Sequence, residues 1–166
     1  MSDLGQSYRV AAVRFERRLP GSLEQVWAHL TEARKLTAWY GEDGAIEPRE
    51  GGAVLFMGGH IKGVVTRWRP HRQLAHTWNV FSPGETDSSY PESYLTFDLE
   101  PDGAQVKLTL THLPILERFE KQNAMGWHTY LDMLAAAVEG RPIEARQVYS
   151  QKNAGLYGVD MGSLAR

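Results

Sequence analysis

The order of its amphipathic segments constrains the fold of this chain more than any other feature. A strand-like segment (8–19) comes first, two short helical segments follow, and a long helical segment (115–139) comes after the strands. The intervening strand-like segments are 43–48, 53–57, 60–69, 72–80, 93–100 and 104–112. Helices segregated from strands in this way predict an α+β fold, in which a long helix covers one face of a seven-stranded antiparallel sheet.

The last two strand-like segments indicate that only one face of the sheet is covered. In 93–100, Leu95, Phe97 and Leu99 alternate with polar residues, and 104–112 repeats this period of two. Pro101-Asp102-Gly103 between them predicts a hairpin turn. One apolar face and one polar face are typical of an antiparallel sheet that packs on one side.

The helical segments carry recognisable end signals. Ser22, with Gln25 three residues later, forms a capping-box pattern at the start of the first short helix. Thr31 is expected to cap a second short helix that ends near Trp39. Apolar residues spaced three or four apart predict the long helix, which Gly140 and Pro142 should terminate; its stripe is Phe119, Asn123, Trp127, Tyr130, Leu131, Leu134 and Val138.

Length and composition exclude several classes of protein. The 166 residues predict a single domain over 1–142, followed by a C-terminal tail (143–166) that is either docked or partly disordered. The net charge of −2 argues against nucleic acid as a partner, and no run approaches the ~20 apolar residues of a membrane span. Without cysteine or a secretory leader pattern, we expect a cytoplasmic protein without Cys-based zinc sites.

The segment RQLAHTWNV (72–80) raises the question of a pocket. Its alternation places His76 and Trp78 on the inward face with Leu74 and Val80, where they either fill a solid core or line a cavity. Other aromatic residues and one further histidine are also expected to face the interior. The candidate ligand-binding residues are Trp39, Phe56, His76, Trp78, Phe97, His112, Trp127 and Tyr130.

The histidines do not suggest a metal site. No third ligand lies at zinc-like spacing, so we expect neither a metal nor a cofactor. His128 and Asp132 read as an exposed pair one helical turn apart. No known catalytic motif is present, so any catalytic residue stays unassigned.

Four segments, in their order and spacing, resemble the START-like or SRPBCC superfamily, whose helix-grip fold is shared with the birch-pollen allergen. They are most similar to the branch named after the activator of the heat-shock chaperone ATPase. The matching segments are LPGSLEQVWAHLTEARKLTAWYG (19–41), GGAVLFMGGHIKGVVTRWRPHRQLAHTW (51–78), SYLTFDLEPDGAQVKLTLTHL (93–113) and GWHTYLDMLAAAVEG (126–140). The resemblance implies a hydrophobic cavity between the sheet and the long helix, with the loop 81–93 at its rim. It also implies a strand order in which 93–100 lies between His76 and His112, so that their backbones are roughly 10 Å apart and a shared metal is not expected.

Three functions are compatible with this resemblance. The first is binding of an apolar or amphipathic small molecule, such as a lipid or polyketide, in the interior cavity. The second is an enzyme of the polyketide cyclase or dehydratase kind, with His76 or His112 as general acid or base. The third is a chaperone-interacting module. The apolar residues of the tail also allow it to dock on its own sheet or on a second subunit, so a homodimer stays an open alternative.

Overall fold

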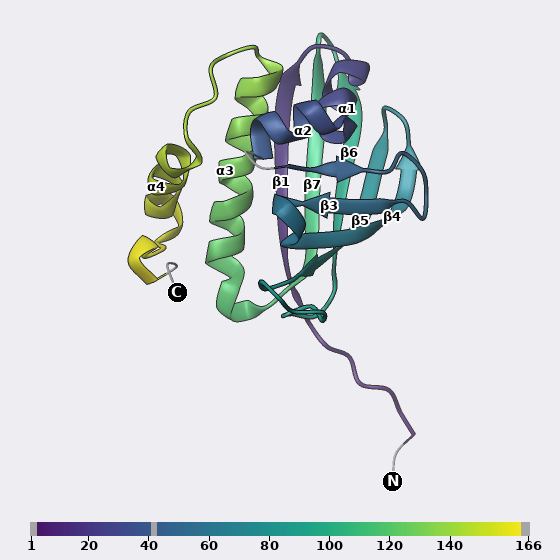
Figure 1. The fold of residues 1–166 in the computed structure, drawn as a ribbon, viewed down its shortest axis with the longest axis vertical. Helices are drawn as coiled ribbons and strands as arrows, with labels where there is room; N and C mark the ends of the chain where they lie inside the picture. Colours follow the sequence, from purple (N-terminus) through teal and green to yellow (C-terminus); the bar gives the residue numbers. More distant parts are fainter. Residues whose placement is uncertain (1–2, 41–42, 164–166) are drawn as a thin grey trace.

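The computed structural model describes residues 3–40 and 43–163, and it has the α+β helix-grip architecture predicted from the sequence. Figure 1 shows a long helix alongside an antiparallel sheet, with two short helices at one end of the sheet. The strand order is β1-β7-β6-β5-β4-β3-β2. The strands are β1 (Ala11–Pro20), β2 (Ala45–Ile46), β3 (Ala53–Phe56), β4 (Ile61–Arg69), β5 (Gln73–Val80), β6 (Ser93–Asp102) and β7 (Gln105–Ile115). The helices are α1 (Leu23–Thr31), α2 (Ala33–Tyr40), α3 (Glu120–Val138) and α4 (Arg146–Tyr157), with short 3₁₀ turns η1 (Met57–Gly59), η2 (Glu117–Phe119) and η3 (Met161–Ser163).

The start of α1 confirms one capping prediction, and the start of α2 contradicts another. The Ser22 hydroxyl accepts a hydrogen bond from the Gln25 amide, and the Gln25 side chain accepts one from the Ser22 amide. Thr31, however, is the last residue of α1, and its hydroxyl donates to the Trp27 carbonyl. Thr31 therefore cannot cap α2: its hydroxyl bonds back into the preceding turn, as threonine often does within helices.

The hairpin between β6 and β7 turns two residues later than predicted. Asp102 pairs with Gln105, which leaves Gly103 and Ala104 as a two-residue turn, with Gly103 at a φ of +60°. Pro101 is therefore part of β6 and pairs with Val106. Pairing with β5 ends at Asp98, so the missing N–H of Pro101 removes no ladder hydrogen bond there.

Strand β4 contains a bulge, which interrupts the alternation of inward and outward residues along it. Its pairing with β5 shifts between Val65 and Arg67. Before the bulge, Gly63 lies so close to β5 that an added Cβ would be 2.0 Å from the Thr77 carbonyl oxygen. The Thr77 hydroxyl accepts a hydrogen bond from the Val64 amide. Thr77 is consequently buried, although the alternation predicts it on the solvent face.

Several element ends also differ from the sequence-based prediction. Strand β1 begins at Ala11 and not at residue 8, because residues 3–10 extend away from the body of the molecule (Figure 1). Strand β2 covers two residues of the predicted 43–48. The long helix begins at Glu120 and not at 115, because β7 continues to Ile115 and η2 follows it.

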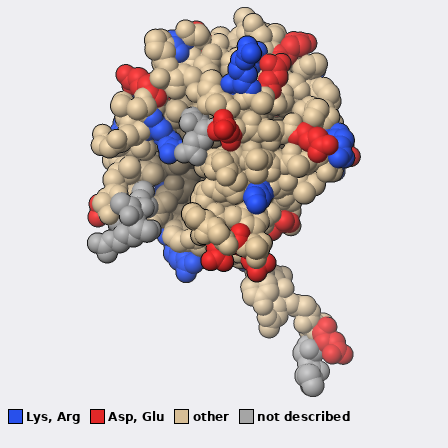
Figure 2. All heavy atoms as spheres, in the orientation of Figure 1, with Lys and Arg blue, Asp and Glu red and all other residues tan. Residues whose placement is uncertain are grey.

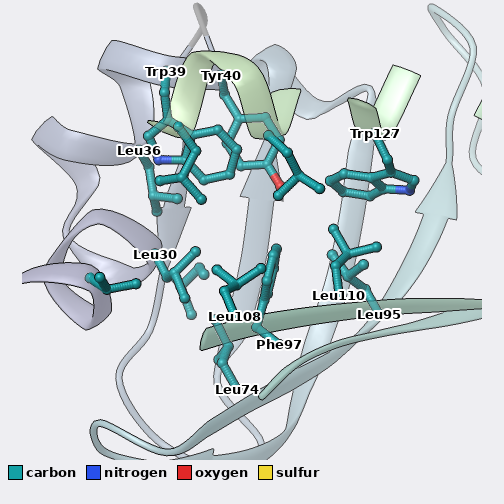
Figure 3. Packing of buried hydrophobic residues seen from close by; sticks show 14 of the residues in the cluster. Leu30, Leu36, Trp39, Tyr40, Leu74, Leu95, Phe97, Leu108, Leu110 and Trp127 are labelled. Carbon is teal, nitrogen blue, oxygen red and sulfur yellow. The ribbon is translucent and has the colours of Figure 1, made fainter. Parts of the chain in front are cut away.

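The core lies between the sheet and α3, as predicted. Phe97 from β6 and Leu108 from β7 lie on the same side of the sheet as Trp127 from α3 (Figure 3). The rings of Phe97 and Trp127 meet edge to face with centroids 6.5 Å apart. Trp27 of α1 is also buried and packs against Trp68 of β4. A single apolar layer therefore joins the sheet to all three of the helices that cover it.

The C-terminal segment contains a helix, α4, that packs against the outer face of α3 (Figure 1). The Asn153 amide donates to the Thr129 hydroxyl and to Asp132. His128 Nδ1 lies 2.8 Å from the Tyr157 hydroxyl. The predicted His128–Asp132 pair is present, with His128 Nε2 3.7 Å from the Asp132 carboxylate, but it is not exposed, because α4 partly covers both side chains. Residues 164–166 of the predicted tail lie outside the described residues.

Candidate functional site

A pocket of about 800 Å³ opens between the sheet and the N-terminal half of α3, at the end of the fold opposite α1 and α2. Its apolar and aromatic lining residues are Val10, Ala11, Trp78, Val80, Tyr90, Pro91, Pro114, Ile115, Leu116, Phe119, Gly126, Trp127 and Tyr130. Its polar and charged lining residues are Arg9, Ser93, His112, Glu117, Gln122 and Asn123. A mostly apolar wall with a few polar groups is typical of small-molecule sites, and the volume lies within their usual range.

Four of the eight candidate residues line this pocket. Trp78 of β5 and His112 of β7 form part of its sheet wall, and Trp127 and Tyr130 project from α3. The Trp78 and Trp127 rings are 5.2 Å apart. Trp78 is only partly buried, because one side of its indole faces the pocket.

The other four candidates lie in the solid part of the core. They are Trp39, Phe56, His76 and Phe97, each at most 2% exposed and none among the pocket-lining residues. Trp39 stacks on Tyr40, and its indole N–H donates to the His29 carbonyl, which fixes it between the short helices. The sequence periodicity predicts that all eight residues face inward. It does not predict which of them meet packed neighbours and which meet open space.

His112 is held in the pocket wall by a directed series of hydrogen bonds. The Trp127 indole N–H donates to His112 Nδ1 at 2.9 Å, so the imidazole proton is on Nε2. His112 Nε2 then donates to the Ser93 hydroxyl at 2.7 Å, and that hydroxyl donates to the Trp78 carbonyl. Both imidazole nitrogens of His112 are thus engaged by protein groups. These bonds fix the position of His112 in the pocket wall and leave it no free lone pair.

His76 occupies the same cross-strand row, one layer behind the pocket. Leu95 pairs with His76 on one side and with His112 on the other, so β6 separates the two histidines as predicted. His76 Nδ1 donates to the Thr77 carbonyl at 2.9 Å, which leaves Nε2 as the acceptor. Among the described residues, Nε2 has no hydrogen-bond partner.

Burial keeps both histidines neutral at ordinary pH. Desolvation lowers the pKa of His76 from 6.5 to about 4, although its bond to Thr77 opposes this. Desolvation also lowers the pKa of His112 to about 4, and the nearby His76 adds to the effect. Each imidazole is therefore an uncharged group of fixed tautomer, suited to hydrogen bonding and poorly matched to proton transfer near pH 7.

The mouth of the pocket contains residues that sequence reasoning did not identify. Arg9 and Val10 from the N-terminal arm border it, and Gln122 and Asn123 border it from α3. Tyr90, in the loop predicted at the rim, packs edge to face on Phe119 with centroids 5.5 Å apart. The sequence does contain one sign of the pocket, namely a glycine within a helical pattern, which costs stability and therefore needs a reason. Gly126 is that residue, and an added Cβ there would meet no atom within 4 Å.

A metal-binding cluster or a membrane-spanning helix would indicate another class of function, and residues 3–40 and 43–163 contain neither. No group of three or more histidine, aspartate or glutamate side chains is placed to hold a metal ion. No helix in this part of the chain is long and apolar enough to cross a bilayer.

A long helix held against an antiparallel sheet, with two short helices after the first strand and an aromatic pocket between the layers, defines a START-like, helix-grip protein. The family model of the activator of Hsp90 ATPase homolog 1-like proteins matches residues 20–139. The chain belongs to this family. A comparison with curated protein sequences finds no match.

Solved structures with the same fold come from several organisms. CalU16 from Micromonospora echinospora is 21% identical with a TM-score of 0.71, covering 89% of this chain and 85% of its own. The protein encoded by gene BPP1335 of Bordetella parapertussis is 25% identical with a TM-score of 0.69, covering 96% and 93%. The Aha1 dimer of Colwellia psychrerythraea is 22% identical with a TM-score of 0.65, covering 78% and 96%.

Proposed function

We propose that this protein binds an apolar or amphipathic small molecule in the pocket between its sheet and α3. The observation that carries the proposal is the pocket itself, about 800 Å³ in volume, with aromatic walls and one neutral, hydrogen-bonded histidine. A concave, mostly apolar surface that is reached from solvent is typical of ligand-binding grooves in folded proteins, and this favours binding in the pocket over a role for the outer surface alone.

The hydrogen bonds in the wall favour binding over acid–base catalysis. His112, the histidine that reaches the pocket, accepts from Trp127 and donates to Ser93, so it has no lone pair with which to take a substrate proton. Its pKa of about 4 also places it far from the range of an efficient general base at neutral pH. A cyclase-like role for His112 would require these two bonds to break first.

Charge on the surface gives no support for a polyionic partner. Figure 2 shows lysine, arginine, aspartate and glutamate side chains scattered over the visible face, without a continuous patch of one sign. The two charged residues among those that line the pocket, Arg9 and Glu117, are of opposite sign. Recognition is therefore expected to depend on the apolar wall, where burial contributes about 25 cal/mol per Å² of apolar surface.

The test fills the pocket from the helix side. In Gly126→Leu, the new Cβ would meet no atom within 4 Å, and the side chain would start from a residue that lines the pocket and should occupy part of it. Gly155→Leu is the matched control, because Gly155 is an exposed helical glycine of α4 with equally open surroundings. Binding is measured by titration with the dye 1-anilinonaphthalene-8-sulfonate and with a long-chain fatty acid, and folding by circular dichroism.

The proposal expects wild type and Gly155→Leu to bind both probes equally well. Gly126→Leu should remain folded and lose at least tenfold in affinity. If wild type binds neither probe, or if the leucine at position 126 leaves affinity unchanged, the pocket is not a binding site.

A further inference from the structure

The N-terminal arm, residues 3–10, begins at the mouth of the pocket and leads away from the body of the molecule (Figure 1). Arg9 and Val10 line the mouth, and β1 follows directly from Ala11. Ala11 pairs with Ile115, where β7 ends and the chain turns towards η2. Among the described residues no strand therefore continues beside the arm, and its backbone extends past the end of the sheet.

One face of the arm is apolar and exposed. Leu4, Tyr8 and Val10 are 85%, 80% and 60% exposed. They occupy alternate positions of the chain, so an extended arm carries all three on the same side. Single apolar residues on a surface are ordinary, but three on one face of so short a segment form an apolar patch. This patch lies next to the mouth of an apolar pocket.

Tyr8 can reach the pocket without any change in β1. It directly precedes Arg9, which lines the mouth, and consecutive Cα atoms are only about 3.8 Å apart. Its hydroxyl donates a hydrogen bond to the Gln6 side chain, so this bond lies within the arm and moves with it. Tyr90 and Phe119 line the same pocket, so apolar surface is available to the Tyr8 ring there.

We propose that the arm closes over an occupied pocket, and that Tyr8 then contacts the ligand directly. The inference rests on the proposed function and adds a ligand-binding segment, residues 3–10, to the residues that line the pocket. Over an empty pocket the Tyr8 ring would bury little apolar surface, whereas an apolar ligand supplies a surface for it to cover. Closure is therefore coupled to binding.

The arm is expected to cover its own pocket and not that of a second copy. Because the arm is joined to the mouth at Arg9, its local concentration there is roughly millimolar, as for other short flexible linkers. A second copy at micromolar concentration competes poorly with this arrangement. Terminal segments also move within nanoseconds to microseconds, so closure tightens binding without becoming the slow step of ligand exchange.

The experiment measures the affinity for dodecanoate and the order of the arm, both on the full chain. Affinity is measured by isothermal titration calorimetry. Order is measured by NMR, as the steady-state heteronuclear NOE of the backbone amides of residues 3–10 with and without saturating dodecanoate.

Three variants separate the ring from the rest of the arm. Tyr8→Ser removes the ring, and Tyr8→Phe keeps the ring and removes the hydroxyl. Ser7→Asn is the control, because Ser7 lies on the opposite side of an extended arm. Both Ser7 and Tyr8 are exposed, so all three variants should fold.

Dodecanoate should raise the heteronuclear NOE of the arm amides in wild type towards the values of β1. Tyr8→Ser should bind dodecanoate about threefold to tenfold more weakly, since the burial of one aromatic ring is partly offset by the entropy lost when the arm is ordered. Tyr8→Phe and Ser7→Asn should bind like wild type. Gly126→Leu, designed to fill part of the pocket, should bind weakly and leave the arm unchanged.

The outcomes distinguish failure of arm closure from failure of the proposed function. If dodecanoate binds wild type but leaves the arm amides unchanged, or if Tyr8→Ser binds as tightly as wild type, the pocket stands and closure is refuted. A complex that sediments as a dimer would place the arm on a second copy and also refute it. If Tyr8→Phe is as weak as Tyr8→Ser, the effect belongs to the hydroxyl, and contact through the ring is refuted. If dodecanoate does not bind wild type, the proposed function fails and closure fails with it.

Discussion

Acid should destabilise this protein through His76, and the size of the effect follows from its burial. The imidazole is buried and its pKa is lowered from 6.5 to about 4. Between these two values the unfolded chain binds a proton at position 76 and the folded chain does not. Stability is therefore unaffected above pH 6.5, falls as the pH drops, and levels off below the folded-state pKa. Since a tenfold change in proton affinity is worth about 1.4 kcal/mol, the complete loss is about 3 kcal/mol.

The assay is urea unfolding at pH 7, 6 and 5, followed by tryptophan fluorescence, for wild type and His76→Gln. Glutamine stays neutral throughout, and titration of the other histidines and the carboxylates is common to both proteins, apart from the contribution of His76 to the lowered pKa of His112. Between pH 7 and pH 5 the wild type should lose roughly 2 kcal/mol more than the variant. A difference between the two proteins that stays constant within about 0.5 kcal/mol would refute the reasoning, because it would mean that His76 can take up a proton in the folded protein.

Three further predictions concern stability. Trp78→Ala should cost ~2 kcal/mol of unfolding free energy, less than the ~3–5 kcal/mol expected for a fully packed tryptophan, because part of the indole faces the pocket. A loss of ~3–5 kcal/mol, together with no dye binding by wild type, would show that Trp78 is part of the solid core. Ser93→Ala should cost ~1–3 kcal/mol, since it removes the acceptor of the buried His112 N–H, whereas Ser150→Ala, which loses only a 3.3 Å hydrogen bond to the Gln147 carbonyl of its own helix, should cost little. Gly63→Ala should cost more than ~2 kcal/mol because its Cβ would collide with the Thr77 carbonyl, whereas Gly155→Ala should stabilise α4 by up to ~1 kcal/mol. Denaturant midpoints measure all of these, and a tolerated alanine at position 63 would contradict the close approach of β4 to β5.

The sequence predicts those parts of the fold that depend only on residues close together in the chain. The alternation in β6 and β7 and the capping box at Ser22 each depend on neighbouring residues, and the structure confirms them. The alternation fails in β4 because a bulge at the Val65–Arg67 step changes which residues face inward. The turn after β6 was misplaced because Pro101 usually marks a turn, and only the end of pairing with β5 makes it acceptable in a strand.

The site was predictable in kind and only partly in detail. Periodicity places Trp78, His112 and Trp127 inside, and it places Trp39 and Phe97 inside equally well. Whether an inward side chain meets a packed neighbour or open space depends on contacts between distant segments. The N-terminal arm and η2 border the pocket through such contacts, and no pattern within residues 3–10 indicates it.

The packing of α4 on the outer face of α3 has a consequence for the exchange of the ligand that we propose for the pocket. Helix α3 is held on one side by the sheet and on the other by α4, where Asn153 bonds to Thr129 and Asp132. Widening the pocket by displacing α3 would break both interfaces at once. Moving the segment that carries Tyr90 disrupts its edge-to-face contact with Phe119 and leaves α3 in place. We therefore expect the association and dissociation rates of the proposed ligand to be governed by this loop, and substitutions at Tyr90 to change both rates.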